Sequence, residues 1–365
     1  MAKLFEAFTI KGKEVKNRIV LPPMVIFDKD IKGGMITDGV VEHYKSMAKA
    51  GCAIMIVEAT AIEKNGLIQP LQLGIWDDTF IEGLSILPVI AHNKGALALI
   101  QLVHAGGKAA QADTDDIIAP SSCHFGENEA RSVTLEDIER LKRFFVDAGI
   151  RAKKAGFDGV ELHACHGYLM NQFLSPRFNK RDDIYGREKE KFVVDIIKQL
   201  RKEAGDAFII AIRMPGNDPD LATSISYAKR FEEAGVDLFH MSVGFIPDLS
   251  DEEKSSNIAQ SDISFKPGDL IYEKNDYYNW IVGAGIEIRR HISKPVIVVN
   301  GIRSPAQAHY ILEQGGVDFV ALGRGYLCDL DWIEKAMKDQ PVRECASCRG
   351  KCLRTTGIYN CVLKK

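Results

Sequence analysis

KAGFDGVELHA, residues 154–164, holds the pattern that decides the fold of this chain. A helix-favouring stretch ends at Gly156, and an apolar run follows Asp158. Related phrases occur at three other places, as KAGCAIMIVEA at 49–59, EAGVDLFHMS at 233–242 and QGGVDFVALG at 314–323. Glycine readily adopts the left-handed conformation that caps a helix. Each phrase therefore predicts the end of a helix, its glycine cap and then a buried strand.

The spacing of these phrases predicts how many strands the chain contains. The glycines of the three phrases nearest the C-terminus, Gly156, Gly235 and Gly316, lie about 80 residues apart. This is the length of two strand–helix units of about 40 residues each. Four further strands are expected, one before the first phrase and three between the phrases: RIVLPPM (18–24), ALALIQLVHAG (96–106), FIIAIRMPG (208–216) and PVIVVNG (295–301). Their unbroken apolar runs suit parallel strands covered on both faces. Eight strands alternating with helices fit either a closed barrel or an open, doubly wound sheet.

Polar residues at the carboxyl ends of the expected strands favour the barrel. Glu58, Gln101, His163, Arg213 and Ser242 each end an apolar run. These side chains converge on one mouth only if the sheet closes, and barrel enzymes place their chemistry at that mouth. We therefore expect an α/β protein with a single (β/α)8 TIM barrel over residues 1–340. A short cysteine-rich tail follows over residues 341–365.

Composition narrows the function classes. The 365 residues are 46% hydrophobic and 27% charged, with a net charge of -3, which is typical of a globular protein without a basic surface for nucleic acid. Apolar runs stay well below the roughly 18 residues that span a membrane. The N-terminus lacks the apolar core of a signal peptide. We expect a cytoplasmic enzyme acting on a small molecule, with no membrane partner, and a homo-oligomer remains open.

The densest concentration of reactive side chains is HACHGYLMNQFLSPRFNKRDDIYG, residues 163–186. His163 and His166 are three residues apart and would share a face if the segment were a helical turn. Two neutral imidazoles can donate to one carbonyl or nitro oxygen, or coordinate a metal, and Tyr168 follows as a candidate proton donor. The alternative is a pair of histidines that merely hydrogen-bond the backbone at a strand end.

The same segment closely resembles the signature of the Old Yellow Enzyme family of FMN oxidoreductases. NRIVLPPM, EATAIEKNGL and IQLVHAGGKA resemble that family's first three strands, and DFVALGRGYLCDLDW resembles its last. The resemblance runs from about residue 3 to residue 340. It implies a barrel that binds FMN and is reduced by NADH or NADPH.

The resemblance also implies which residues contact the FMN. They lie at the strand ends and comprise Pro23, Met24, Val25 and Ala59 along the ring, Gln101, His163 and Arg213 near its polar edge, and Gly301, Gly323 and Arg324 at the phosphate. An arginine there would stabilise the negative charge of the reduced flavin. Relatives often carry Thr or Cys in place of Val25, and valine cannot donate a hydrogen bond to the flavin.

In relatives the histidine pair holds the activating oxygen of the substrate over the flavin. The tyrosine gives a proton to one alkene carbon while hydride reaches the other. By resemblance, His163 and His166 take the first role and Tyr168 the second, so the expected activity is an ene-reductase acting on α,β-unsaturated carbonyls or similar acceptors. The alternatives are a flavin and iron–sulfur electron-transfer subunit, or an oxidative dehydrogenase or demethylase that acts with a partner protein.

The tail carries a second motif, Cys345-x2-Cys348-x3-Cys352-x8-Cys361. Four thiolates at such spacing can hold a [4Fe–4S] cluster, and zinc or free thiols are the alternatives. The motif resembles that of the iron–sulfur 2,4-dienoyl-CoA reductase and trimethylamine dehydrogenase branch, although the last gap is shorter here. We find no dinucleotide-binding fingerprint in the chain. Electrons would therefore come from a nicotinamide docked over the FMN or from an electron-donor protein through the cluster.

Overall fold

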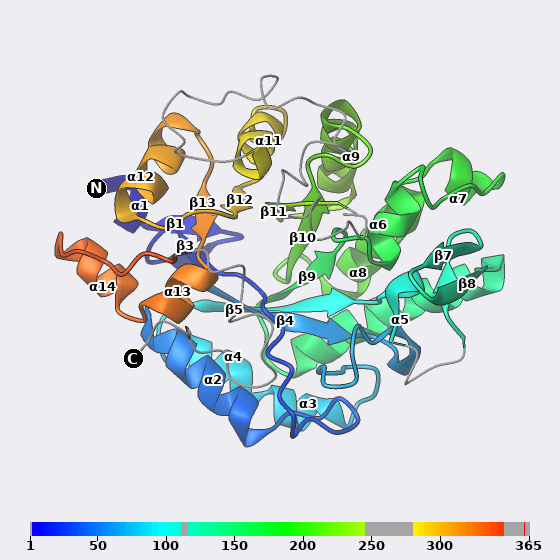
Figure 1. The fold of residues 1–365 in the computed structure, drawn as a ribbon, viewed down its shortest axis with the longest axis horizontal. Helices are drawn as coiled ribbons and strands as arrows, with labels where there is room; N and C mark the ends of the chain where they lie inside the picture. The colour runs from blue at the N-terminus through cyan, green and yellow to red at the C-terminus, as the bar shows by residue number, and fades with distance from the viewer. Residues whose placement is uncertain (1, 111–115, 245–279, 347–360, 362–365) are drawn as a thin grey trace.

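The computed structural model describes residues 2–110, 116–244, 280–346 and Cys361. Its centre is a closed barrel of eight parallel strands, which follow one another around the ring in chain order (Figure 1). The predicted TIM barrel is confirmed, and the open sheet is excluded. The strands are β3 (Ile19–Leu21), β4 (Ile54–Ala61), β5 (Leu97–Val103), β9 (Gly159–His163), β10 (Ile209–Pro215), β11 (Leu238–Ser242), β12 (Val296–Val299) and β13 (Phe319–Ala321).

Helices surround the strands on the outside of the barrel (Figure 1). Their buried faces form the larger apolar core together with the outward side chains of the strands. The helices that follow the strands are α2 (Asp38–Lys49), α3 (Phe80–Leu84), α4 (Ile86–His92), α5 (Leu135–Lys154), α6 (Leu169–Leu174), α7 (Ile184–Arg187), α8 (Lys191–Ala204), α9 (Leu221–Ala234), α11 (Trp280–Arg289), α12 (Pro305–Gln314), α13 (Arg324–Cys328) and α14 (Trp332–Met337). Among the described residues, none of the helices is long and apolar enough to cross a membrane.

The inside of the barrel changes from apolar to polar along the strands. Ile209 and Ala211 of β10 belong to the inner apolar cluster, and Arg213 is the next residue with the same orientation. In β5 the inner Leu99 is followed in the same way by Gln101. The inward-facing residues of a strand therefore pack in the core near its amino end and line the candidate site near its carboxyl end.

A hairpin closes the amino end of the barrel. Strands β1 (Phe8–Ile10) and β2 (Lys13–Val15) pair antiparallel, and Ile10 and Val15 join the inner apolar cluster. The Phe8 ring meets the Phe319 ring edge-on, with 5.2 Å between ring centroids. The open end of the barrel is therefore the carboxyl end, where the polar side chains lie.

The recurring glycine phrase behaves as predicted. Gly51, Gly156, Gly235 and Gly316 have φ angles of 84°, 94°, 119° and 70°, in the left-handed region that other residues avoid. Each glycine turns the chain from a helix toward the next strand.

The aspartates of the phrase have a role that the sequence analysis did not assign. The carboxylates of Asp158, Asp237 and Asp318 accept hydrogen bonds from the amides of Ala98, Ile210 and Val296 at 2.9, 3.0 and 3.0 Å. Each amide belongs to the first or second residue of the preceding barrel strand. The aspartates therefore fix the register of neighbouring strands at the amino end of the barrel.

The insertion after β5 is folded rather than irregular. Its strands β6 (Ile118–Ala119), β7 (Cys123–Phe125) and β8 (Asn128–Ser132) form a small sheet in the order β6-β8-β7. The short helical turn η2 (Gly106–Lys108) connects the barrel to this sheet. The insertion thus places Lys108 beside the barrel mouth.

Candidate functional site

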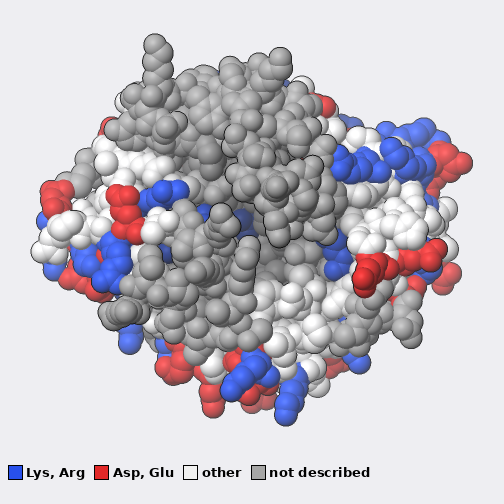
Figure 2. All heavy atoms as spheres, in the orientation of Figure 1, with Lys and Arg blue, Asp and Glu red and all other residues white. Residues whose placement is uncertain are grey.

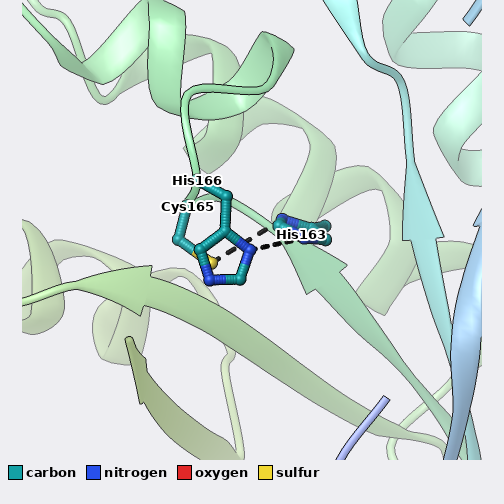
Figure 3. A group of neighbouring side chains, drawn as sticks. All are labelled: His163, Cys165 and His166. Carbon is teal, nitrogen blue, oxygen red and sulfur yellow. Dashed lines mark hydrogen bonds between the residues drawn. The ribbon is translucent and has the colours of Figure 1, made fainter. Parts of the chain in front are cut away.

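The two histidines of the dense motif meet through a left-handed turn. Strand β9 ends at His163, and His166 has a φ of +60°, which is rare for a residue with a side chain. Nδ1 of His166 lies 3.3 Å from Nε2 of His163 (Figure 3). The predicted pairing of the side chains is therefore correct, but the helical turn that was expected to produce it is wrong. Helix α6 begins only at Leu169.

Polar side chains hold this strained turn in place. Asn171 accepts a hydrogen bond from the amide of Gly167 at 2.8 Å, and Gln172 donates to the carbonyl of the same glycine at 2.8 Å. Lys108 donates to the carbonyl of His166 at 3.0 Å. A backbone conformation of this kind persists only when its surroundings enforce it, and such conformations cluster at functional sites. The sequence analysis missed these supports, although Asn171 and Gln172 lie inside the motif.

Burial sets the protonation states of the histidines and the tyrosine. The pKa values of His163 and His166 are well below the usual range, first because of burial and then because of the Arg213 cation. Burial raises the pKa of Tyr168 to about 12. The Tyr168 ring lies 5.0 Å from the His163 ring, measured between centroids. Near neutral pH the site therefore contains two neutral imidazoles beside a protonated phenol.

Cys165 lies beside both histidines. One potential ligand atom from each of His163, Cys165 and His166 lies within 4.8 Å of the others (Figure 3). However, Cys165 contacts Nδ1 of His163 at 3.7 Å, whereas His166 contacts the opposite ring nitrogen. The contacts favour a hydrogen-bonded group over a metal centre.

A cavity of about 440 Å³ opens at the carboxyl end of the barrel. It brings together predicted residues from the first, fourth, fifth, seventh and eighth strands of the barrel. The cavity is lined by Pro23, Met24, Val25, His166, Arg213, Gly301, Gly323 and Arg324, and also by Ser242, Asn300, Arg303 and Cys345. On the face seen in Figure 2, acidic and basic side chains are mixed along the outer edge of the described part of the molecule.

The remaining predicted residues lie beside this cavity or deeper in the barrel. His163 contacts His166, and Tyr168 packs against His163. Ala59 is buried in β4, and its carbonyl accepts a hydrogen bond from Gln72 at 2.7 Å. Gln101 is buried in β5. None of these four residues lines the described cavity itself.

Gln101 leads to a buried polar network that the sequence analysis missed. Its amide donates to Oε1 of Glu161 at 2.7 Å, and Oε2 of Glu161 lies 2.7 Å from Nδ1 of His240. Glu161 and His240 are fully buried. Both face inward because they stand two residues before His163 and Ser242 in their strands, so strand alternation is the signal that could have found them.

The chemistry of the cavity fits a flavin mononucleotide. Nε of Arg213 is buried and has no hydrogen-bond partner among the described residues, so it is free to face an anionic or acceptor group. A Cβ atom at Gly323 would lie 2.9 Å from the sulfur of Met24, so a larger residue there would displace the Met24 side chain from the cavity wall. Arg303 and Arg324 line the same cavity and supply cations suited to a phosphate.

Comparison with known proteins agrees with this fit. Residues 3–342 match the family described as NADH:flavin oxidoreductase / NADH oxidase. The chain belongs to this family. Members are FMN flavoproteins that use nicotinamide cofactors, and the Old Yellow Enzyme homologues are among them.

Two relatives illustrate the membership. The NADPH dehydrogenase of Geobacillus thermodenitrificans is 36% identical, and the match covers 93% of this chain and 95% of that relative. The NADH oxidase of Thermoanaerobacter brockii is 32% identical over 96% of this chain. The chain spans about half of that longer relative, 53% of its length.

Solved structures share the fold of this family member. An Old Yellow Enzyme homologue from Zymomonas mobilis has a TM-score of 0.76 and 24% identity, with 94% of each chain covered. A 2-naphthoyl-CoA reductase in complex with 2-naphthoyl-CoA has a TM-score of 0.84 and 22% identity. That match covers 98% of this chain and 56% of the reductase. At these identities the likeness concerns the barrel alone.

The cysteine tail is only partly described. Cys345 lines the cavity, whereas Cys348 and Cys352 lie outside the described residues. Cys361 is buried and hydrogen-bonds the thiol of Cys328, whose pKa rises to about 11 because of burial and this contact. Cys328 is therefore a neighbour of the tail and not an isolated core cysteine. The division into a barrel over 1–340 and a tail over 341–365 remains a prediction.

Proposed function

We propose that the protein is an FMN-dependent NAD(P)H:acceptor oxidoreductase of the ene-reductase type. The observation that carries the proposal is the convergence of three side chains at the barrel mouth. Nε2 of His163 and Nδ1 of His166 face one another at 3.3 Å, and the protonated Tyr168 packs against His163. An electron-transfer subunit with an idle substrate site would not need this arrangement.

Each residue has a role in this proposal. When bound, FMN supplies the hydride. His163 and His166 bind the activating oxygen of an α,β-unsaturated carbonyl or nitro compound, because neutral imidazoles can donate to that oxygen as negative charge develops. Tyr168 gives its hydroxyl proton to the alkene carbon next to the activating group. Arg213 stabilises negative charge at the pyrimidine edge of the flavin.

The other contacts to FMN in this proposal follow the walls of the cavity. Gln101 holds the pyrimidine edge with its amide, which already donates to Glu161 and keeps its oxygen as an acceptor. The other members of the set are Pro23, Met24, Val25 and Ala59 along the ring and Gly301, Gly323 and Arg324 at the phosphate.

One anaerobic experiment tests the activity. The purified protein should release FMN on denaturation, in a ratio of about one per chain. Stopped-flow mixing with NADH and with NADPH should bleach the bound flavin, and an enone or nitroalkene should restore its colour. A saturated ketone of similar size is the control acceptor. Release of FAD, absence of flavin, or equal reoxidation by saturated and unsaturated acceptors would refute the proposal.

A second function is suggested by the tail. We propose that Cys345, Cys348, Cys352 and Cys361 ligate a [4Fe–4S] cluster, as in the iron–sulfur branch that the motif resembles. The supporting observation is that Cys345 lines the same cavity as Arg324, while Cys361 is buried nearby against Cys328. Such a cluster supplies single-electron transfer, so an electron-donor protein would be a partner. An oxidative dehydrogenase or demethylase would use the same pair of cofactors.

A further inference from the structure

Four side chains at the barrel mouth form a closed ring of hydrogen bonds. Sγ of Cys165 lies 3.7 Å from Nδ1 of His163, and Nε2 of His163 lies 3.3 Å from Nδ1 of His166. Nε2 of His166 lies 2.8 Å from Oγ of Ser242, and Ser242 in turn hydrogen-bonds the Cys165 thiol. Both histidines therefore have a partner at each ring nitrogen.

The ring restricts the tautomers of the two histidines. A neutral imidazole has one N–H donor and one acceptor nitrogen, whereas a hydroxyl or thiol can donate or accept. Without a ligand, one histidine donates to the other, and the hydrogen bonds run in one direction around the ring. In each of the two directions, every member donates once and accepts once.

A substrate oxygen changes this requirement. If the oxygen accepts hydrogen bonds from both Nε2 of His163 and Nδ1 of His166, both nitrogens must carry a proton. The outer nitrogens must then accept, which needs a donor at Nδ1 of His163 and another at Nε2 of His166. Cys165 and Ser242 occupy these two positions. Only one imidazole must change its tautomer to move from the ligand-free ring to this state.

We propose that Cys165 is a positioning residue whose thiol donates to Nδ1 of His163 and so presents the Nε2 proton of that histidine to the substrate oxygen. Ser242 performs the same task for His166. The inference rests on the proposed function, because it assigns the source of the two converging donors. It also assigns a specificity: the site selects ligands that offer a hydrogen-bond acceptor, such as a carbonyl, nitro or phenolate oxygen.

Other observations favour a donor role over simple core packing for Cys165. The side chain is completely buried, and its sulfur contacts two polar partners of the site. The pKa of this thiol is raised by burial, so the proton that it donates stays in place near neutral pH. Cys52 offers a contrast, because it is also buried but belongs to the apolar core.

The test compares matched cysteine variants of the FMN-loaded protein. The probe is 4-chlorophenol, titrated at a fixed pH and followed by the charge-transfer absorbance of a phenolate stacked on flavin. Cys165→Ala should raise the Kd about tenfold, the size expected for loss of an outer hydrogen bond that orients a ligand-binding histidine. Cys165→Ser retains a donor and should stay within about twofold of wild type. The control Cys52→Ala should leave the Kd unchanged.

A second readout reports the tautomer directly. Two-bond ¹H–¹⁵N spectra of the phenol complex should show a protonated Nε2 and a bare Nδ1 on His163 in the wild type. In Cys165→Ala the Nδ1 proton should become populated. A purely structural role for Cys165 would not change this tautomer.

The outcomes separate the inference from the proposed function. If wild type binds the phenol, His163→Ala weakens binding and Cys165→Ala matches wild type in Kd and tautomer, the role of Cys165 is overturned while the function stands. If neither wild type nor His163→Ala distinguishes the phenol from cyclohexanol, the proposed function itself fails.

Discussion

Replacing Tyr168 by phenylalanine should slow only one half of the catalytic cycle. A positioned general acid typically contributes about 10²–10⁴-fold to a rate. Burial raises the pKa of Tyr168 to about 12, which makes it a weak acid at neutral pH, so we expect a loss near the lower limit, about 10²-fold. That factor corresponds to about 2.7 kcal/mol of barrier. Reduction of the flavin by NAD(P)H needs no proton from this residue and should stay near the wild-type rate.

Anaerobic stopped-flow experiments separate the two half-reactions. Flavin absorbance is followed first with the nicotinamide and then with an enone. In wild type the enone step should be independent of pH up to about pH 10, because the hydroxyl stays protonated below its pKa of about 12. Tyr326→Phe is the matched control, since it removes another phenol hydroxyl, one that is buried and has no partner among the described residues. Equal enone rates in wild type and Tyr168→Phe would refute the assignment of the acid.

Three further perturbations have defined outcomes. Burial raises the pKa of Glu58 to about 8, so the free energy of unfolding should fall as pH rises from about 4.5 through 8. Glu58→Gln should make the urea midpoint of unfolding less dependent on pH over this range, and an equally steep pH dependence in the variant would contradict this role of Glu58. Arg213→Ala should lower the two-electron midpoint potential of bound FMN by about 30–60 mV, the equivalent of one charge-assisted hydrogen bond, whereas an unchanged potential would place Arg213 away from the ring. Anaerobic preparations should contain about four irons and four sulfides per chain, and Cys348→Ser should abolish them while FMN remains; stoichiometric zinc, or no metal, would defeat the cluster.

The barrel was predictable because its signals are local and repeated. The glycine caps at Gly156, Gly235 and Gly316 each mark the passage from helix to strand, and the structure confirms all three. Closure of the sheet was predicted from the polar strand ends. Residues such as Gln101 and Arg213 are expected at the end of an apolar strand where the strands converge on the mouth of a barrel. The strands are shorter than the apolar runs in the sequence. Strand β3 ends before Pro22, which lines the cavity, and strand β10 ends before Gly216.

The parts that escaped prediction depend on contacts between distant segments. The left-handed conformation of His166 is supported by Lys108 and by the carbonyl of Val243, which no local pattern reveals. Glu161 and His240 looked like isolated polar residues, because their hydrogen bond joins strands 79 positions apart. The contact between Cys328 and Cys361 exists only once the tail returns to the barrel.

The aspartates at the amino end of the barrel also bear on how the protein assembles. Parallel strands are slow to pair, because their partners lie far apart in the chain and a long loop must close first. Two of these carboxylates reach amides only 27 and 22 residues earlier, at Ile210 and Val296. A neighbouring pair of strands can therefore test its alignment within one strand–helix–strand unit, before the rest of the ring exists. A pair shifted by one residue would leave a buried carboxylate without its amide, and this cost would reject the error early in folding.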